Sequence, residues 1–192
     1  MKEMSKIIGN NLNSIRKNRG LSLDKVAEIT GVSKAMLGQI ERGESNPTVQ
    51  ILWKISTGLK VSFSSFLEEG REHKELLLVS RAEIDPVVEE EGQMKIYPLY
   101  FFDSKRGFEI FTIELEPGCN HVSEPHNDGV EEYIIVTEGM VDLIIENDIY
   151  KLNKGDAIRY YANKKHIYRN KSEKRACFQH LIYYGLAEDP YF

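Results

Sequence analysis

No stretch of the 192-residue sequence approaches the roughly 18 consecutive apolar residues that a membrane-spanning helix requires. Only two cysteines occur, Cys119 and Cys177, which are too few for a disulfide framework and fit a reducing compartment. The first residues are polar and contain no apolar core of the kind that defines a signal peptide. These absences predict a soluble, cytoplasmic protein that does not bind or span a membrane.

Positive charge is also in deficit, because 25 lysines and arginines are set against 30 aspartates and glutamates, for a net charge of −5. Taken whole, that balance does not suggest a nucleic-acid binder. The charge is unevenly distributed, however: residues 1–60 carry 10 basic and 5 acidic side chains, or +5, and residues 61–192 carry the remaining 15 and 25, or −10. Such an asymmetry is expected when one domain meets a polyanion, although ordinary surface variation explains it equally well.

The pattern of apolar residues changes at the same place. Up to about Leu67 they recur at helical spacing in short segments, whereas from Leu76 onward they form short β-rich runs separated by turn residues. A polar stretch lies between the two patterns. We therefore predict an α + β chain of two domains: an all-α domain of five helices over residues 1–67, a linker over 68–75 and an all-β domain over 76–192.

Apolar spacing and capping residues predict the five helices of the first domain at residues 7–18, 23–30, 34–42, 49–59 and 62–67. The second and third are separated only by Gly31-Val32-Ser33, which is the spacing of a helix-turn-helix. In such a unit the second helix projects its first side chains into the major groove of DNA. A helical module for protein contacts is the alternative.

The side chains of that second helix suit base recognition. Lys34 can reach guanine, Gln39 can form two hydrogen bonds with adenine, and Ala35 can contact a thymine methyl group. Arg42 and Asn46 are placed to hold phosphates, which fix the position of the protein without reading sequence.

Residues 22–43 resemble the helix-turn-helix of the Cro-like (XRE) phage repressors, and the resemblance extends over residues 7–67. It implies base contacts by Lys34, Ala35 and Gln39, and phosphate contacts by Ser33, Arg42 and Asn46. Leu23 stands where many members of the family carry a glutamine that bonds the DNA backbone, so we leave this position out of the predicted site.

Two motifs within residues 108–185 resemble those of the cupin (jelly-roll) barrels. The first combines Gly118, Glu124, His126, Glu132 and Gly139, and the second combines Gly155, His166 and Asn170. Cupins that bind metal use two histidines and a glutamate of the first motif and one histidine of the second. The resemblance therefore implies a β-barrel with a candidate site at Glu124, His126, Glu132 and His166.

These four positions predict either a metal site or a polar pocket. Two histidines with one or two carboxylates suit Fe(II), Mn(II), Ni(II) or Zn(II). The same side chains can instead line a pocket for an organic ligand or serve as ordinary polar groups of the barrel. Glu124 replaces the first histidine of the motif, and Glu131 competes with Glu132 for the role of the glutamate. Tyr160 and Tyr161 are weaker candidates to face this pocket.

Together the two halves predict a sequence-specific transcriptional regulator that is not an enzyme. The helical domain is expected to bind a palindromic double-stranded operator as a homodimer, with its recognition helices about 34 Å apart. The cupin domain is expected to bind a small-molecule effector. The alternative is a mononuclear iron oxygenase that carries a helix-turn-helix, with His126, a glutamate at 131 or 132, and His166 as ligands. The DNA-reading positions favour the regulator, because an enzyme has no need of them.

Overall fold

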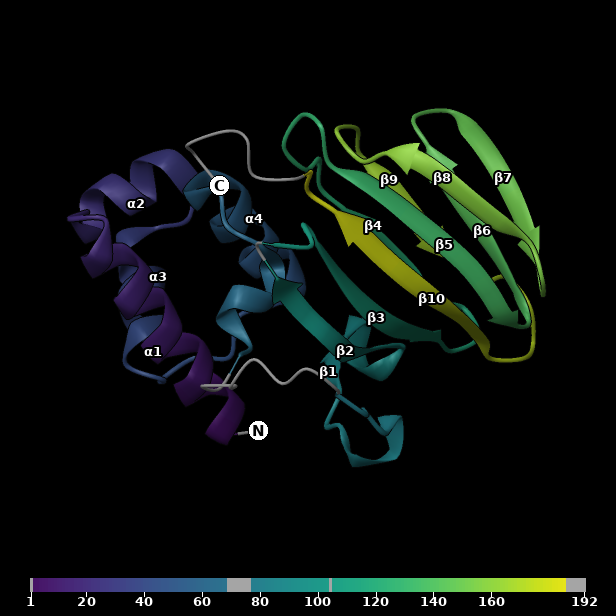
Figure 1. Cartoon of the computed structure of the whole chain (residues 1–192), viewed down its shortest axis with the longest axis horizontal. Coiled ribbons are helices and arrows are strands. Elements are labelled where there is room, and N and C mark those ends of the chain that lie inside the picture. The colour runs from purple at the N-terminus through teal and green to yellow at the C-terminus, as the bar shows by residue number, and fades with distance from the viewer. Residues whose placement is uncertain (1, 69–76, 104, 186–192) are drawn as a thin grey trace. The chain divides into compact units, whose positions relative to one another are not determined.

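The computed structural model describes residues 2–68, 77–103 and 105–185 (Figure 1). The chain divides into two compact units, with the boundary between Leu77 and Leu78. The predicted linker, residues 68–75, lies outside the described residues apart from Glu68. No helix in the described parts of the chain is both long and apolar enough to cross a bilayer.

Four α-helices form the described part of the first unit: α1 (Lys2–Asn18), α2 (Leu23–Thr30), α3 (Lys34–Glu41) and α4 (Val49–Leu59). The last three begin as predicted, since Ser22, Ser33 and Thr48 each accept a hydrogen bond from a backbone N–H of the first turn. α2 ends at Gly31, whose φ of 68° lies in the left-handed region that glycine adopts without strain.

The prediction of a fifth α-helix is wrong. Residues Phe63–Phe66 form only a 3₁₀ turn, η1, and Ser62 makes no capping hydrogen bond with its side chain. Nδ2 of Asn11 in α1 donates to the carbonyl oxygens of Phe66 and Glu68, both at 2.9 Å. A contact with another helix therefore binds the carbonyls that a continuing α-helix would use for its own hydrogen bonds.

The helix α3 is fixed against α1 by close backbone contact and by a buried polar group. A Cβ added to Gly9 of α1 would lie 2.4 Å from the carbonyl oxygen of Ile40, so glycine permits the close approach. Arg16 of α1 donates twice to the Glu41 carboxylate, at 2.6 and 2.8 Å, and Asn13 donates to it at 2.6 Å. Such a two-point contact fixes orientation as well as distance, so the inner face of α3 is anchored.

Ten strands make up the described part of the second unit. They are β1 (Val87–Glu89), β2 (Met94–Asp103), β3 (Phe108–Leu115), β4 (Asn120–Ser123), β5 (Glu131–Glu138), β6 (Met140–Ile145), β7 (Asp148–Asn153), β8 (Ala157–Tyr161), β9 (His166–Arg169) and β10 (Ala176–Tyr183). They form two antiparallel sheets, ordered β1-β2-β3-β10-β5-β8 and β4-β9-β6-β7 (Figure 1).

The two sheets face each other, since Tyr168 of β9 donates a hydrogen bond to Glu132 of β5. They do not join into a closed barrel, because the outer strands β1, β8, β4 and β7 each pair on one side only within the described chain. The predicted barrel is therefore corrected to an open arrangement of two sheets, with the interior of the unit between them.

The register of the strands brings polar side chains to one point of this interior. β10 lies between β3 and β5, and it sets His180 opposite Ile134, two residues beyond Glu132. β8 flanks β5 on its other side and sets Tyr160 opposite Glu132. The facing sheet contributes His166 at the start of β9. Residues that are far apart in sequence thus become neighbours of a single carboxylate.

Candidate functional sites

The outer face of α3 is the first candidate site. Its exposed residues, with the capping residue included, are Ser33, Lys34, Ala35, Met36 and Gln39. Leu37 and Ile40 are buried on the opposite side. The hydroxyl oxygen of Ser33 accepts the Met36 N–H at 3.2 Å, so this side chain fixes the start of the helix. The face offers an ammonium, an amide and apolar groups of the kinds that read base edges.

Two of the side chains predicted to contact DNA are held in surface ion pairs. Nζ of Lys34 lies 2.8 Å from Oδ2 of Asp24, and Arg42 lies 2.7 Å from Glu44. All four side chains are more than half exposed, so the pairs contribute little to stability. Asn46 is exposed as well. Phosphates can therefore replace these carboxylates at little cost.

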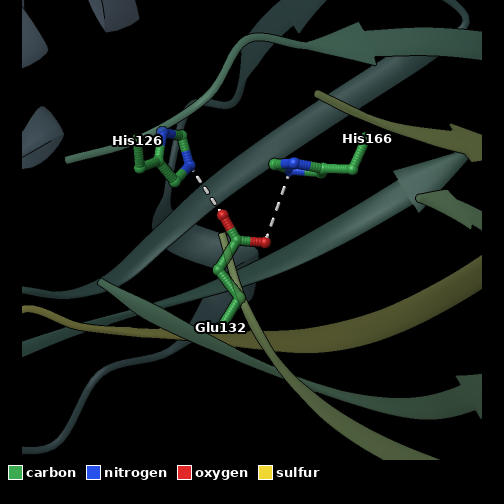
Figure 2. A group of neighbouring side chains, drawn as sticks. All are labelled: His126, Glu132 and His166. Atoms are coloured by element: carbon green, nitrogen blue, oxygen red, sulfur yellow. Dashed lines mark hydrogen bonds and ion pairs between the residues drawn. The ribbon is translucent and has the colours of Figure 1, made fainter. Parts of the chain in front are cut away.

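A buried cluster between the sheets is the second candidate site. Nε2 of His126 lies 2.6 Å from Oε1 of Glu132, and Nε2 of His166 lies 3.6 Å from Oε2 (Figure 2). His126 belongs to the loop before β5, Glu132 to β5 and His166 to β9. All three are buried, and their possible ligand atoms lie within 4.8 Å of one another. Figure 2 shows the two rings approaching the carboxylate from two sides.

Two tyrosines complete the surroundings of the Glu132 carboxylate. Tyr160 and Tyr168 both donate to Oε2, and their hydroxyl oxygens lie 2.8 Å apart. Burial raises the pKa of both tyrosines well above the usual range, and the charge of Glu132 adds to the effect. Burial alone would raise the pKa of Glu132, but the neighbouring imidazoles of His180 and His166 and the hydrogen bond with His126 hold that pKa well below its usual range. Glu132 is therefore an ionised carboxylate in a buried position.

The backbone sets the tautomer of His166. Its Nδ1 lies 2.9 Å from the carbonyl oxygen of Lys164, which can only accept, so Nδ1 carries the hydrogen. Burial lowers the pKa of His166 against the attraction of Glu132, so the ring is neutral and Nε2 carries a lone pair. A lone pair 3.6 Å from a carboxylate oxygen is an unfavourable neighbour unless a cation lies beside both.

His180 of β10 is a third imidazole at the same carboxylate. Its Nε2 lies 3.0 Å from Oε2 of Glu132. Both this atom and Nε2 of His166 are buried, and neither is aligned for a hydrogen bond with any described residue, although Nε2 of His180 lies close to the carboxylate. A buried polar atom without a partner costs free energy. Imidazoles beside a carboxylate are the ligands that Fe(II), Ni(II) and Zn(II) accept, so the residues present fit a divalent metal ion.

The structure brings together three of the four positions named from the cupin motifs. Glu124 is half-buried and lies outside the cluster of His126, Glu132 and His166. Glu131 turns away from the cluster, because its carboxylate accepts from the Tyr133 hydroxyl at 3.2 Å. The carboxylate in the interior is thus that of Glu132.

Of the two tyrosines named from the sequence, Tyr160 reaches the cluster, whereas Tyr161 is 61% exposed. Tyr168 and His180 are not among the residues predicted from the sequence. Burial alternates at Phe178, His180 and Ile182 along β10, but the sequence does not signal it, because Leu181 on the other face is apolar as well. Nor does the sequence indicate which strands lie beside β10.

Known proteins resemble this chain in both of its units. A helix-turn-helix family model matches residues 12–66, and a cupin domain model matches residues 111–183. The chain is 40% identical over 184 residues to the HTH-type transcriptional regulator SutR of Escherichia coli (strain K12), which covers 96% of this chain and 98% of that protein. It is 39% identical to an HTH_3 family transcriptional regulator from Vibrio cholerae, whose crystal structure superposes with a TM-score of 0.81 over 96% of this chain and 98% of the other.

A more distant similarity involves an iron protein. The crystal structure of FeII HppE superposes with a TM-score of 0.50 and covers 93% of this chain and 99% of that chain. The two sequences are only 14% identical, so this likeness concerns the fold alone.

Proposed function

Because the chain belongs to the HTH-type transcriptional regulators that join a helix-turn-helix to a cupin domain, we propose that it reads its operator with the outer face of α3. It is a DNA-binding regulator of transcription. The observation that carries the proposal is the orientation of α3, whose inner face is anchored to α1 while its polar side chains are exposed. In this proposal Lys34, Ala35 and Gln39 contact bases, and Ser33, Arg42 and Asn46 contact phosphates.

We further propose that the regulator binds DNA as a homodimer. One short recognition helix offers only a few base contacts, and a symmetric pair doubles them on a palindromic site. The α3 helices of the two copies then lie about 34 Å apart, which is one turn of the duplex, and the two half-sites are centred about 10 base pairs apart.

Selection of binding sites from a pool of random double-stranded DNA tests both parts of this proposal. We expect an enriched inverted repeat, protected in footprints by a complex whose mass contains two chains. An unrepeated sequence bound by one chain contradicts the homodimer and leaves the role of α3 in place. Failure to enrich any sequence contradicts the role of α3 itself.

The buried cluster supports a second proposal: the cupin unit binds a divalent metal ion through His126, Glu132 and His166 and uses this site to sense a small-molecule effector. The supporting observation is the lone pair of His166, which is buried, has no hydrogen bond and faces an ionised carboxylate. A divalent cation supplies positive charge and open coordination positions to which an anionic or carbonyl-bearing effector can bind. Tyr160 and Tyr168 hold the carboxylate in place through their hydrogen bonds.

Metal analysis after treatment with a chelator and reloading with Fe(II), Mn(II), Ni(II) or Zn(II) tests this second proposal. We expect one ion per chain, and we expect the variant His166→Gln to lose it while still binding the operator. A wild-type protein that takes up none of these ions contradicts the metal site and favours a pocket for an organic ligand. Oxygen-dependent turnover by the iron-loaded protein would instead favour the iron oxygenase.

A further inference from the structure

His180 lies outside both cupin motifs and outside the group of His126, Glu132 and His166, yet its ring reaches the carboxylate that the group shares. It is on β10, the last described strand, after the second motif has ended at Asn170. Its position opposite Ile134 of β5 makes it a diagonal neighbour of Glu132 on the same face of the sheet. Its Nε2 is therefore 3.0 Å from a carboxylate oxygen that His166 also approaches.

Apart from the Glu132 carboxylate, the neighbours of His180 include aromatic rings. Its side chain is only 5% exposed, and the rings of Phe111 and Phe178 lie 6.4 and 6.0 Å away between centroids. Nε2 of His180 faces the Glu132 carboxylate at 3.0 Å without the alignment of a hydrogen bond, so packing alone does not satisfy this buried nitrogen. Coordination of a cation would use the lone pair of Nε2 of His180.

The motifs of this chain also supply two imidazoles, whereas those of a metal-binding cupin supply three. Glu124 stands where a metal-binding cupin carries its first histidine, and it lies outside the cluster. Building on the metal site proposed above, we infer that His180 is the fourth protein ligand of that site and replaces the missing imidazole. The complete set is His126, Glu132, His166 and His180, from the loop before β5 and from β5, β9 and β10.

This ligand set defines the class of metal. Three imidazoles and one carboxylate suit Fe(II), Co(II), Ni(II) or Zn(II), whereas Mg(II) and Ca(II) require oxygen ligands. If a metal ion were bound here, Nε2 of His180 would supply its lone pair to the ion. Four protein ligands would leave such an ion room to bind water or an effector.

Cobalt(II) is the probe for the first test, because its visible absorption depends on the number and kind of its ligands. The full chain, stripped of metal with a chelator, is compared with His180→Gln and with His121→Gln. His121 is the matched control, since it is a buried histidine of β4 whose ring stacks on Tyr168, whereas the ion pairs of Glu132 are with His126, His166 and His180. We expect His180→Gln to weaken Co(II) binding by at least about tenfold and to change the absorption spectrum, and His121→Gln to match the wild type. Unchanged affinity and spectrum in His180→Gln would overturn the inference.

A second measurement uses the wild-type chain and does not depend on whether a variant folds. Long-range proton–nitrogen NMR spectra of the imidazole rings are followed while Zn(II) is added to the metal-free protein. We expect the Nε2 resonances of His126, His166 and His180 to move together, and that of His121 to stay in place. Movement of the first two without His180 overturns the inference but leaves the metal site standing. If none of them moves, the proposed metal site fails as well.

Discussion

The two units of this chain present their polar side chains in opposite ways. The helical unit carries them outward on α3, where Lys34 and Gln39 lie within one short helix and touch solvent. The β unit turns them inward, where Glu132 meets side chains from two facing sheets and is completely buried. A surface site can be altered without disturbing the fold, whereas a site of this buried kind is also part of the core. DNA binding and stability should therefore respond to different substitutions in the helical unit, whereas ligand binding and stability should respond to the same substitutions in the β unit.

The distribution of charge follows the same division. Residues 1–60 carry a surplus of five positive charges, which suits a surface that meets phosphates, and the rest of the chain carries a surplus of ten negative charges. The acidic part is repelled by the duplex, which favours contact through the helical unit. The net charge of −5 therefore conceals a DNA-binding surface.

Glu132→Gln should have the largest effect on stability. It removes the charge that two tyrosine hydroxyls and His126 bond in a buried place, so we expect the free energy of unfolding of the β unit to fall by about 3–5 kcal/mol. Urea denaturation followed by circular dichroism, with a chelator present, measures it. The single tryptophan, Trp53, belongs to α4 and reports the helical unit separately through its fluorescence.

Glu131→Gln is the matched control for this change. Its carboxylate lies on the other face of β5, beside Tyr133 and the exposed Arg159, so we expect a change within about 0.5 kcal/mol. Equal losses in the two variants would show that the carboxylate of Glu132 has no special role in the core. A large shift in the Trp53 transition would show that the two units do not unfold separately.

Lys34→Ala and Gln39→Ala should affect DNA binding and leave the fold intact. Each removes a proposed base contact, so we expect a loss of about 1–3 kcal/mol at the selected operator together with relaxed sequence preference. Fluorescence anisotropy with operator and scrambled duplexes measures both quantities. Lys25→Ala is the control, since Lys25 is an exposed lysine of α2 that pairs with Glu28 at 2.7 Å. If all three variants weaken both duplexes equally, α3 contributes charge and no reading of sequence.

The pH dependence of the free energy of unfolding should reflect the lowered pKa of His166 in the folded chain. Its pKa is lower in the folded chain than the value of about 6.5 expected when unfolded, because burial disfavours the charged ring. Below about pH 6.5 the unfolded chain therefore binds a proton that the folded chain does not, and stability falls by up to about 1.4 kcal/mol per pH unit. Above that pH this contribution is constant.

His166→Gln should remove this part of the pH dependence. The measurement is the free energy of unfolding across about pH 5–8 in the presence of a chelator, for the wild type and the variant. We expect the two curves to run parallel above about pH 6.5 and to converge below it. Curves that stay parallel throughout would mean that the pKa of His166 is the same in both states.

The same contrast explains what the sequence can predict. The starts of α2, α3 and α4 are predictable because Ser22, Ser33 and Thr48 bond backbone groups only three residues away. The turn η1 is not, because Asn11 bonds it from the other end of the unit. The outward face of α3 follows from helical periodicity alone, whereas its role in reading DNA stays a prediction.

In the β unit, the motifs name His126, Glu132 and His166, which the structure brings together in one cluster. They place Glu124 there as well, and the structure does not. Tyr168 and His180 escape prediction because their inclusion depends on strand register and on the facing of two sheets, which are set by contacts between distant segments.

Asp24→Asn should have the smallest effect, and it tests whether the exposed Lys34 of α3 contacts DNA. It opens the exposed ion pair with Lys34, so we expect stability to change by less than about 0.5 kcal/mol. Operator affinity should rise by about 0.5 kcal/mol at low salt, because Lys34 is released and one negative charge near the duplex is lost, and the gain should shrink as salt is added. Glu28→Gln is the matched control: it removes the same charge from the same helix but releases Lys25, which lies outside α3. A larger gain for Asp24→Asn identifies Lys34 as a contact, whereas equal gains would assign the effect to net charge and remove Lys34 from the proposed reading face.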